Sequence, residues 1–540
     1  MDSGGTRTPP VIVQATMFFI VGILVAENQH LHWLWLGFLI PVLFSLRFLL
    51  GIGTVPVYVF GLFGFTWGSW HLHEIRTDDS IIQTGYETGP TLFRLIGRVT
   101  DIDPDPSWGS KSLFTPIQLL DSTGNRMSVR GRLSWRVEGG HHLCDGDLVH
   151  LVGWTFPPGG PESAADGNGV DWTSMARFSG YRGRLVVPDP RLVHRLPEYG
   201  LSGMIPSLRG ALRSRYAEIV SRGVSAYRER TLLLGMTIGI RGPSWNRVSA
   251  PFRRTGVAHV LAISGMHLGI VIGFVFFICR VSGASGPVIA LSTIITTLLY
   301  LTIVSWRPPI VRSAIMAITL SLGACRGRFP KSTSLLFLAA MVILLHNPGS
   351  LFLPGFQLSF VVVLFILTGT RSVQRRWFRR TGPTAGIGVR SCAVASIQTT
   401  LVVSVVAWLA SIPIIVHHFG TISPFAVPLS IILVPFLTTI LGLSCLKITL
   451  SVFGLEDLVS PELMMFPTRC VITIVDWFDS LPMSCIAIEH SSWIVVPTGL
   501  SAVAVWSVFG LRESCWKITH LLVRRSGRSG RTERGLPDHD

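Results

Sequence analysis

The chain has 540 residues, of which 48% are hydrophobic and only 14% are charged. Together with several apolar runs of about 18 residues or more, this composition argues against a soluble protein and predicts a polytopic α-helical membrane protein. The net charge of +16 fits either contacts with nucleic-acid phosphates or arginine-rich cytoplasmic loops, so its meaning depends on where the charges lie. The eight cysteines stand singly without metal-ligand spacing, and we expect neither a metal site nor a cofactor.

Residues 1–70 have the pattern of three transmembrane helices, which we expect at residues 11–26, 31–50 and 51–70. The first of them resembles a signal peptide, but no small-residue cleavage site follows it, so we interpret it as a retained signal anchor. If the N-terminus is cytoplasmic, the chain leaves the membrane on the outer side after residue 70.

Residues 71–200 have the composition of a soluble, extracytoplasmic domain. Polar and apolar residues alternate in five stretches, which predicts strands at residues 91–103, 113–121, 126–137, 147–156 and 177–188. Five strands of this length suit a small β-barrel of the OB-fold type. Such barrels often bind single-stranded nucleic acid, yet this part has 13 Lys or Arg against 16 Asp or Glu. A local basic strip is either a DNA contact or a solvated face: Arg126, Arg130, Arg132 and Arg136.

Residues 201–254 are predicted to link this domain to a second membrane block. Apolar residues recur at helical spacing among the arginines of residues 206–230, which is typical of a basic amphipathic helix at a membrane surface and equally of an ordinary packed helix. The apolar run at residues 232–240 is too short to span, so we expect it to be re-entrant or interfacial.

Residues 255–511 return to the bilayer. Crossings are predicted at residues 257–279, 288–306, 310–325, 334–346, 351–368 and 392–415, with one or two more at 422–450, an interfacial segment at 467–482 and a last crossing at 493–511. The arginine clusters at 326–331 and 371–380, and the basic tail at 512–540, can then all lie in the cytoplasm. Orientation thus explains most of the net charge without a nucleic-acid partner.

The run HVLAISGMHLG at residues 259–269 is the most polar part of these apolar segments. On one helix, His259, Ser264 and His267 would fall within an arc of about 140°. Polar residues in the bilayer usually face a cavity or a pathway, although Ser264 could bond to a helical carbonyl and the glycines could serve helix packing. Gly265 and Gly269 of the same run also belong to the predicted intramembrane polar site, and its remaining members lie in or just after three later crossings: Arg312, Gln357, Ser359, His417 and His418.

Four stretches of the chain resemble, in order, the signature segments of the ComEC/Rec2 family of competence proteins. They are FRRTGVAHVLAISGMHLGIV, PPIVRSAIMA, NPGSLFLPGFQLSFVVV and IPIIVHHFGTISPF. The resemblance implies a multi-pass channel in the bacterial inner membrane, which takes up single-stranded DNA during natural transformation. It also implies partners: the lipid bilayer, a cytoplasmic ATPase motor, a periplasmic DNA receptor and a nuclease.

The chain differs from full-length members of that family in one respect that bears on enzymatic activity. Its sequence has no HxHxDH motif of the C-terminal metallo-β-lactamase-like domain, so the resemblance carries over no nuclease activity and we expect no enzyme. Two other hypotheses stay open. One is a related transporter or scaffold that does not act on DNA, and the other is an intramembrane hydrolase using Ser264 with His259 or His267, which lacks an orienting carboxylate.

Overall fold

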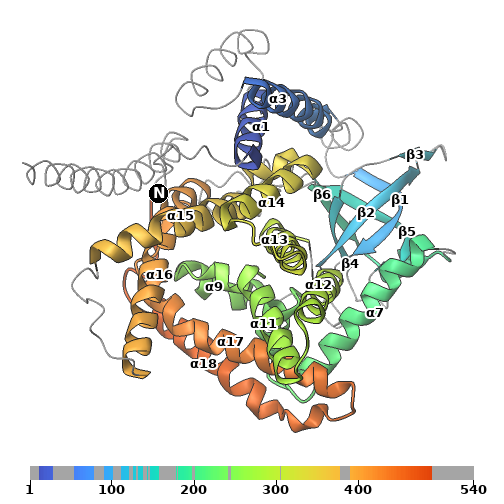
Figure 1. Cartoon of the computed structure of the whole chain (residues 1–540). Helices are drawn as coiled ribbons and strands as arrows, with labels where there is room; N and C mark the ends of the chain where they lie inside the picture. Colours follow the sequence, from blue (N-terminus) through green and yellow to red (C-terminus); the bar gives the residue numbers. More distant parts are fainter. Residues whose placement is uncertain are drawn as a thin grey trace, which may run out of the picture.

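The computed structural model describes most of the chain as a group of helices with a β-sheet on one side (Figure 1). The described residues are 11–27, 54–77, 91–100, 111–120, 126–128, 132–137, 143, 146–156, 178, 181–197, 201–240, 245–304, 306–377 and 389–488. The crossings predicted at residues 31–50 and 493–511 lie outside this part, as does Arg130.

Two N-terminal helices, α1 (Val11–Glu27) and α3 (Thr54–Thr77), pack closely against each other. Glycine makes this contact possible, because a Cβ atom at Gly64 would lie only 2.9 Å from the Cα of Phe19. Small residues of this kind let apolar helices approach each other where no water drives their association. The Oγ1 of Thr16 also donates a hydrogen bond to the Phe337 carbonyl at 3.2 Å, which ties α1 to the second helical block.

The sheet contains seven strands. They are β1 (Thr91–Thr100), β2 (Lys111–Leu120), β3 (Arg126–Ser128), β4 (Arg132–Val137), β5 (Leu148–Phe156), β6 (Tyr181–Val187) and β7 (Val193–Arg195). Pairing runs β1–β2–β4–β6–β5, and β5 also pairs with β1. The pair β4–β6 is parallel and the other pairs are antiparallel. The alternation that predicted the strands follows from their burial, since every second side chain enters a core around Phe114, Trp135 and Leu151.

The strand predicted at residues 126–137 is wrong in one detail, because the structure divides it into β3 and β4. Both strands pair with β2, but their registers differ by one residue: Gln118 lies opposite Ser128, whereas Phe114 lies opposite Leu133. The two described strands therefore pair with the same partner strand in two different registers.

Three helices lead from the sheet to the second block: α7 (Leu201–Ser221), α8 (Tyr227–Thr237) and α9 (Trp245–Arg254). The single helix predicted at residues 206–230 is therefore wrong. It ends before Gly223, which has a φ of +77° that other residues rarely adopt. The apolar run predicted as re-entrant or interfacial forms most of α8, and the side chains from Thr231 to Thr237 are buried in the protein.

The second block contains the remaining helices. They are α10 (Ala258–Leu261), α11 (Gly265–Val281), α12 (Gly286–Ile303), α13 (Pro308–Cys325), α14 (Ser332–His346), α15 (Pro354–Trp377), α16 (Val389–Phe419), α17 (Ala426–Ser451) and α18 (Pro461–Asp479). The region predicted to hold one or two segments at 422–450 is thus one helix, with Pro435 inside it. Short 3₁₀ turns, η4 (Pro348–Phe352) and η5 (Glu456–Leu458), precede α15 and α18, and β8 (Thr421–Ile422) pairs with β9 (Ile486–Ala487).

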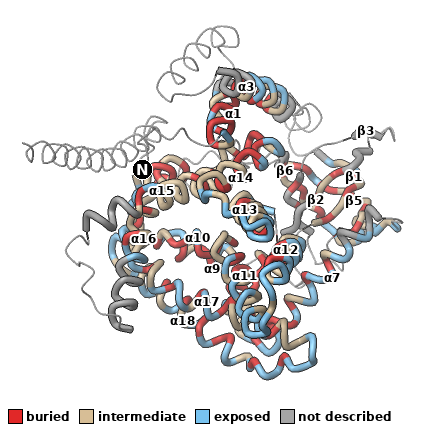
Figure 2. The backbone as a smooth tube through the Cα atoms, in the orientation of Figure 1, coloured by how far each residue is buried: buried red, intermediate tan, exposed pale blue. Residues whose placement is uncertain are grey.

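Four described helices are long and apolar enough to cross a membrane: 286–303, 308–325, 399–419 and 426–451. Only between 17% and 33% of the residues in these apolar stretches are buried inside the protein, and Figure 2 shows pale-blue, exposed faces on several of these helices. On α12 the exposed residues include Leu291, Ile295 and Leu298. An apolar surface of this kind requires lipid around it, so the chain is a membrane protein.

Phe178, which precedes β6, contacts the helical block at η4. The amide Nδ2 of Asn347, which precedes this turn, donates a hydrogen bond to the Phe178 carbonyl at 3.3 Å. The rings of Phe178 and Phe352 lie 5.0 Å apart. Phe178 comes shortly before β6, so these contacts fix the entry to that strand against the start of α15.

Candidate functional site

The polar run at residues 259–269 does not form one helix, as the crossing predicted at 257–279 required. The chain is helical from Ala258 to Leu261, becomes extended at Ala262 and Ser264, and begins a new helix at Gly265. The predicted arc is therefore wrong, since His259 and His267 belong to different helices. His259 is exposed, whereas His267 is fully buried with 0% of its surface accessible.

The break arises from a capping interaction at the start of α11. The Oγ of Ser264 accepts a hydrogen bond from the Met266 N–H at 3.3 Å, and the Nδ1 of His267 accepts one from the Ser264 N–H at the same distance. This is a capping box in which histidine takes the position usually held by glutamate. The Nε2 of His267 has no hydrogen-bond partner in the described part of the chain. His267 thus positions the helix start.

Gly265 brings this helix start into contact with α13. A Cβ atom at Gly265 would overlap the Oγ of Ser313 and would lie 3.3 Å from the Nη2 of Arg312. The Oγ of Ser313 is itself held by a hydrogen bond to the Pro309 carbonyl at 3.0 Å, so it has little freedom to move away. Only glycine fits between the two helices at this point, and it places the Arg312 side chain beside the first turn of α11.

Arg312 is a buried cation with 9% of its surface accessible. Its Cζ lies 5.8 Å from the ring centroid of Phe360 on α15, and its Nε has no hydrogen-bond partner among the described residues. The ion pairs of the described residues all involve other arginines. A charge taken out of water normally requires a paired anion, because desolvation costs several kcal/mol.

Gln357 links α15 to α16. Its Oε1 lies 3.0 Å from the Nε2 of His418, and its Nε2 donates a hydrogen bond to the Leu351 carbonyl in η4 at 3.0 Å. The amide of Gln357 therefore accepts on one side and donates on the other, which requires the Nε2 of His418 to carry a hydrogen. The His418 ring lies 4.9 Å from that of His417.

The structure thus brings most of the predicted intramembrane residues into two groups of contacts, which together we call the polar path. The first group is Ser264, Gly265 and His267 with Arg312, whose Cζ lies over the Phe360 ring, and the second is Gln357 with His418. Phe360 and Gln357 lie about one turn apart on α15. Ser359 lies between Gln357 and Phe360 on α15, and its hydroxyl is buried without a hydrogen-bond partner in the described residues. His259 and Gly269 are exposed, and a Cβ atom at Gly269 would meet no atom within 4 Å.

Three of the four arginines predicted as DNA contacts lie in a different part of the molecule. Arg126 is on β3, Arg132 and Arg136 are on β4, and Arg130 lies outside the described residues. In the sheet register, Arg136 stands opposite Lys111, so two basic residues are neighbours on adjacent strands.

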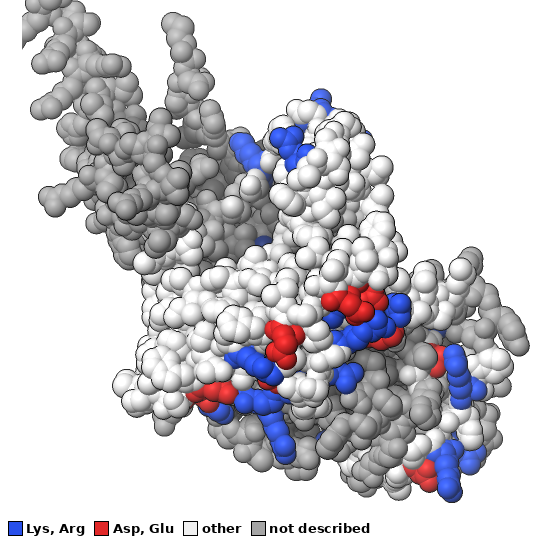
Figure 3. All heavy atoms as spheres, turned by 90° about the horizontal axis from the view of Figure 1, so that it is seen from below, with Lys and Arg blue, Asp and Glu red and all other residues white. Residues whose placement is uncertain are grey.

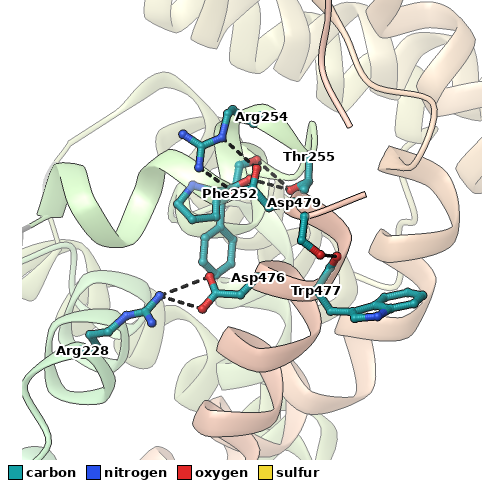
Figure 4. A network of polar contacts seen from close by, with 9 residues as sticks. Arg228, Phe252, Arg254, Thr255, Asp476, Trp477 and Asp479 are labelled. Atoms are coloured by element: carbon teal, nitrogen blue, oxygen red, sulfur yellow. Dashed lines mark hydrogen bonds and ion pairs between the residues drawn. The ribbon is translucent and has the colours of Figure 1, made fainter. Parts of the chain in front are cut away.

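A second group of arginines, which we call the arginine clamp, was missed by sequence reasoning. Arg254 on α9 contacts Asp479 with two hydrogen bonds, the first from Nε to Oδ1 at 2.8 Å, and Arg228 on α8 contacts Asp476 at 3.0 Å (Figure 4). The Asp479 hydrogen bond raises the pKa of Arg254 above its ordinary value. Arg469 reaches Glu229 in the same region.

The arginine clamp joins α18 to α8 and α9 at the surface of the block. Figure 3 shows Lys and Arg atoms next to Asp and Glu atoms on one face, within an otherwise uncharged surface. No sequence pattern indicated these pairings, because the paired residues are separated by 225 to 248 positions in the chain. They stabilise packing between helices that share the largest apolar core of the block.

Residues 236–513, just over half of the chain, match the family described as Competence protein. The chain belongs to this family. The matched residues include the whole polar path and the α18 partners of the arginine clamp. The seven-stranded sheet lies outside the match.

One relative is "ComE operon protein 3" of Bacillus subtilis (strain 168), which is 28% identical over 207 residues. The aligned part is 38% of this chain and 24% of that protein, so the chain spans about a quarter of the relative's length. No solved structure matches the chain.

Proposed function

We propose that the chain is a multi-pass protein of the bacterial inner membrane whose helical block conducts single-stranded DNA into the cell during natural transformation. The observation that carries this proposal is the polar path of the family-matched region, in which Arg312 on α13 lies over Phe360 on α15, and Gln357 on the same helix bonds to His418 on α16. A DNA conduit must supply polar groups to about one negative charge per nucleotide across about 30 Å of hydrocarbon. A buried arginine without a carboxylate partner is suited to that task.

We assign the sheet as an OB-like barrel on the outer side of the membrane. Two features support this assignment: β1 pairs with both β2 and β5, and β4 and β6 are parallel neighbours. A five-stranded Greek-key barrel requires a return of the last strands onto the first. Arg132 and Arg136 on β4 would then receive the strand before it enters the helical block.

Transport needs partners that supply binding and energy. The sequence has no GxxxxGK[ST] phosphate loop that would bind a nucleotide, so we assign the motive force to a cytoplasmic ATPase. A periplasmic DNA receptor and a nuclease acting on the other strand complete the proposed assembly.

The test is DNA uptake in a bacterial strain from which the coding sequence has been deleted. Re-expression of the chain should restore both DNase-resistant internal DNA and transformants. Gln357→Leu, which breaks the link to His418, should lower uptake at least tenfold at equal protein level. Thr368→Val is the matched control, since it removes an exposed hydroxyl from the same helix. Normal uptake in the deletion strain would refute the channel and favour a transporter or scaffold that does not act on DNA.

The distance between Ser264 and His267 supports a second hypothesis, the intramembrane hydrolase. The Oγ of Ser264 lies 3.1 Å from the Nδ1 of His267, within the reach required of a nucleophile and its base. The same atoms, however, form the capping box, and no carboxylate orients the imidazole in the described residues. Labelling of the purified protein by a serine-directed probe, lost in Ser264→Ala and kept in His418→Phe, would favour the hydrolase.

A further inference from the structure

The first turn of α11 presents positive potential to the Arg312 side chain. This helix has 17 residues, and the backbone N–H groups of a first helical turn carry a partial positive charge. Ser264 satisfies the Met266 N–H, but no hydrogen bond joins the Gly265 N–H to another described residue. The helix start therefore keeps a free donor.

The guanidinium of Arg312 lies at the same point. Its Nη2 is 3.3 Å from the position that a Cβ of Gly265 would take, although the side chain is only 9% accessible. Its Nε has no hydrogen-bond partner in the described part, and the Phe360 ring contacts the face of the guanidinium group without accepting an in-plane hydrogen bond. The edge of the guanidinium thus keeps donors that nothing in the described chain accepts.

Two positive groups placed together in an apolar setting repel each other. Burial of an unpaired cation is unfavourable by several kcal/mol, and the neighbouring helix dipole adds to this. A bound anion would offset both effects, because it accepts hydrogen bonds from the guanidinium and from the helix start together. Arginine and helix N-termini are the two groups that proteins use most often for phosphate oxygens.

We propose that the first turn of α11 and the guanidinium of Arg312 form a binding site for one phosphodiester group of single-stranded DNA. Arg312 donates to one phosphate oxygen and the Gly265 N–H to the other, while Ser264 and His267 hold the helix start in place. Gly265 has no side chain that would separate the two donors. This inference rests on the proposed function. Lipid headgroups also carry phosphodiesters, and we choose DNA over lipid as the ligand because the chain is proposed to conduct DNA.

The test measures binding of a fluorescent dT8 oligonucleotide to the purified full chain in phosphate-free detergent buffer. Arg312→Gln should weaken binding at least tenfold, and Arg312→Lys should weaken it less. Arg307→Gln is the matched control, because it removes one positive charge from an exposed residue at the N-cap of α13, the helix that also carries Arg312. It should change the affinity for dT8 less than twofold. A dT8 oligonucleotide with an uncharged methylphosphonate backbone should bind the wild-type chain as weakly as dT8 binds Arg312→Gln.

Three results of the binding measurement would overturn the proposal. They are unchanged affinity in Arg312→Gln, equal loss in Arg312→Gln and Arg307→Gln, and equal binding of the charged and uncharged oligonucleotides. Protection of the wild-type chain against heat by short-chain phosphatidylglycerol but not by dT8, lost in Arg312→Gln, would assign the site to lipid and would also overturn it. Size-exclusion profiles of all variants establish that they are folded.

The outcome is separable from that of the proposed function. Arg312-dependent binding of dT8, with normal uptake in the deletion strain, would support the site and refute the channel. Loss of uptake in the deletion strain, with normal dT8 binding by Arg312→Gln, would support the channel and refute the site.

Discussion

The polar path and the arginine clamp use the same residue type in opposite ways. Arg254 in the clamp is half exposed and has a carboxylate partner held by two hydrogen bonds, whereas Arg312 in the path is buried and has none among the described residues. Surface pairs such as Arg254 and Asp479 contribute modest stability, about 1 kcal/mol or less. An unpaired buried cation contributes none, so its presence points to a ligand. The comparison separates arginines that hold the fold together from one that is available for function.

The largest effect is expected where the path is most crowded. Gly265→Ala should overlap the Oγ of Ser313 and force α11 and α13 apart, which would destabilise the protein by about 1–3 kcal/mol and lower DNA uptake more than tenfold. Uptake and the apparent melting temperature in detergent measure both effects.

Gly269→Ala is the control for this change, because no atom lies within 4 Å of its Cβ position on the same helix. It should leave uptake unchanged. Ser313→Ala combined with Gly265→Ala should recover part of the lost stability, and a double variant as unstable as the single one would contradict the predicted overlap.

The comparison itself is tested by replacing each arginine with methionine. Arg312→Met should raise stability by about 1 kcal/mol while it abolishes uptake, because it removes an unpaired buried charge and keeps an apolar contact with Phe360. Arg254→Met should lower stability by about 1 kcal/mol, because it leaves Asp479 without its partner. Thermal unfolding monitored by tryptophan fluorescence gives both values. Destabilisation by Arg312→Met would mean that its charge has a structural role.

Double-mutant cycles should rank the pairs within the arginine clamp. Asp479 is only 15% accessible in its side chain and Asp476 is 39% accessible, so the Arg254–Asp479 pair should couple by about 1 kcal/mol and the Arg228–Asp476 pair by about half as much. Raising the salt concentration from 0.05 to about 0.5 M should reduce the weaker coupling first. Equal coupling energies of the two pairs at every salt concentration would show that burial of the carboxylate does not strengthen the ion pair.

The smallest effect is expected at His150 on β5. Burial lowers the pKa of its imidazole below 6.5, and nearby His194 and Arg94 lower it further. The folded chain therefore binds this proton less readily than the unfolded chain, so the sheet should lose stability as the pH falls through 6.5 and regain it above. The measurement is the hydrogen-exchange protection factor of the β5 amides, which corrects for the pH dependence of exchange itself, at pH 7.5 and 5.5. The protection factor should fall less than twofold at pH 5.5. His150→Gln should remove this fall without changing the protection of α13.

The four motif stretches located the members of the polar path but could not give their arrangement. Periodicity treated residues 257–279 as one helix, because nothing in a hydrophobic pattern marks a break of three residues. A local signal was present, since Ser264 and His267 have the spacing of a capping box, but histidine is an unusual fourth residue for it. Phe360 and Ser313 joined the site only through packing between helices.

The sheet was easier to predict than the helical linker. Alternation located the strands because burial on one face imposes a period of two, whereas the division into β3 and β4 shows only in their registers with β2. In the linker, the end of α7 depends on the positive φ of Gly223 and its contact with Pro461, which is distant in sequence. The arginine clamp was unpredictable for the same reason.

The contact between Phe178 and η4 has a mechanical consequence. Asn347 holds the main chain just before β6, and the adjacent Leu351 carbonyl holds Gln357, whose other end reaches His418. A force applied to the sheet is therefore passed to this 3₁₀ turn over only a few covalent bonds. If the sheet receives the proposed cargo, tension in the incoming strand would reach His418 through the protein before the strand itself arrives there.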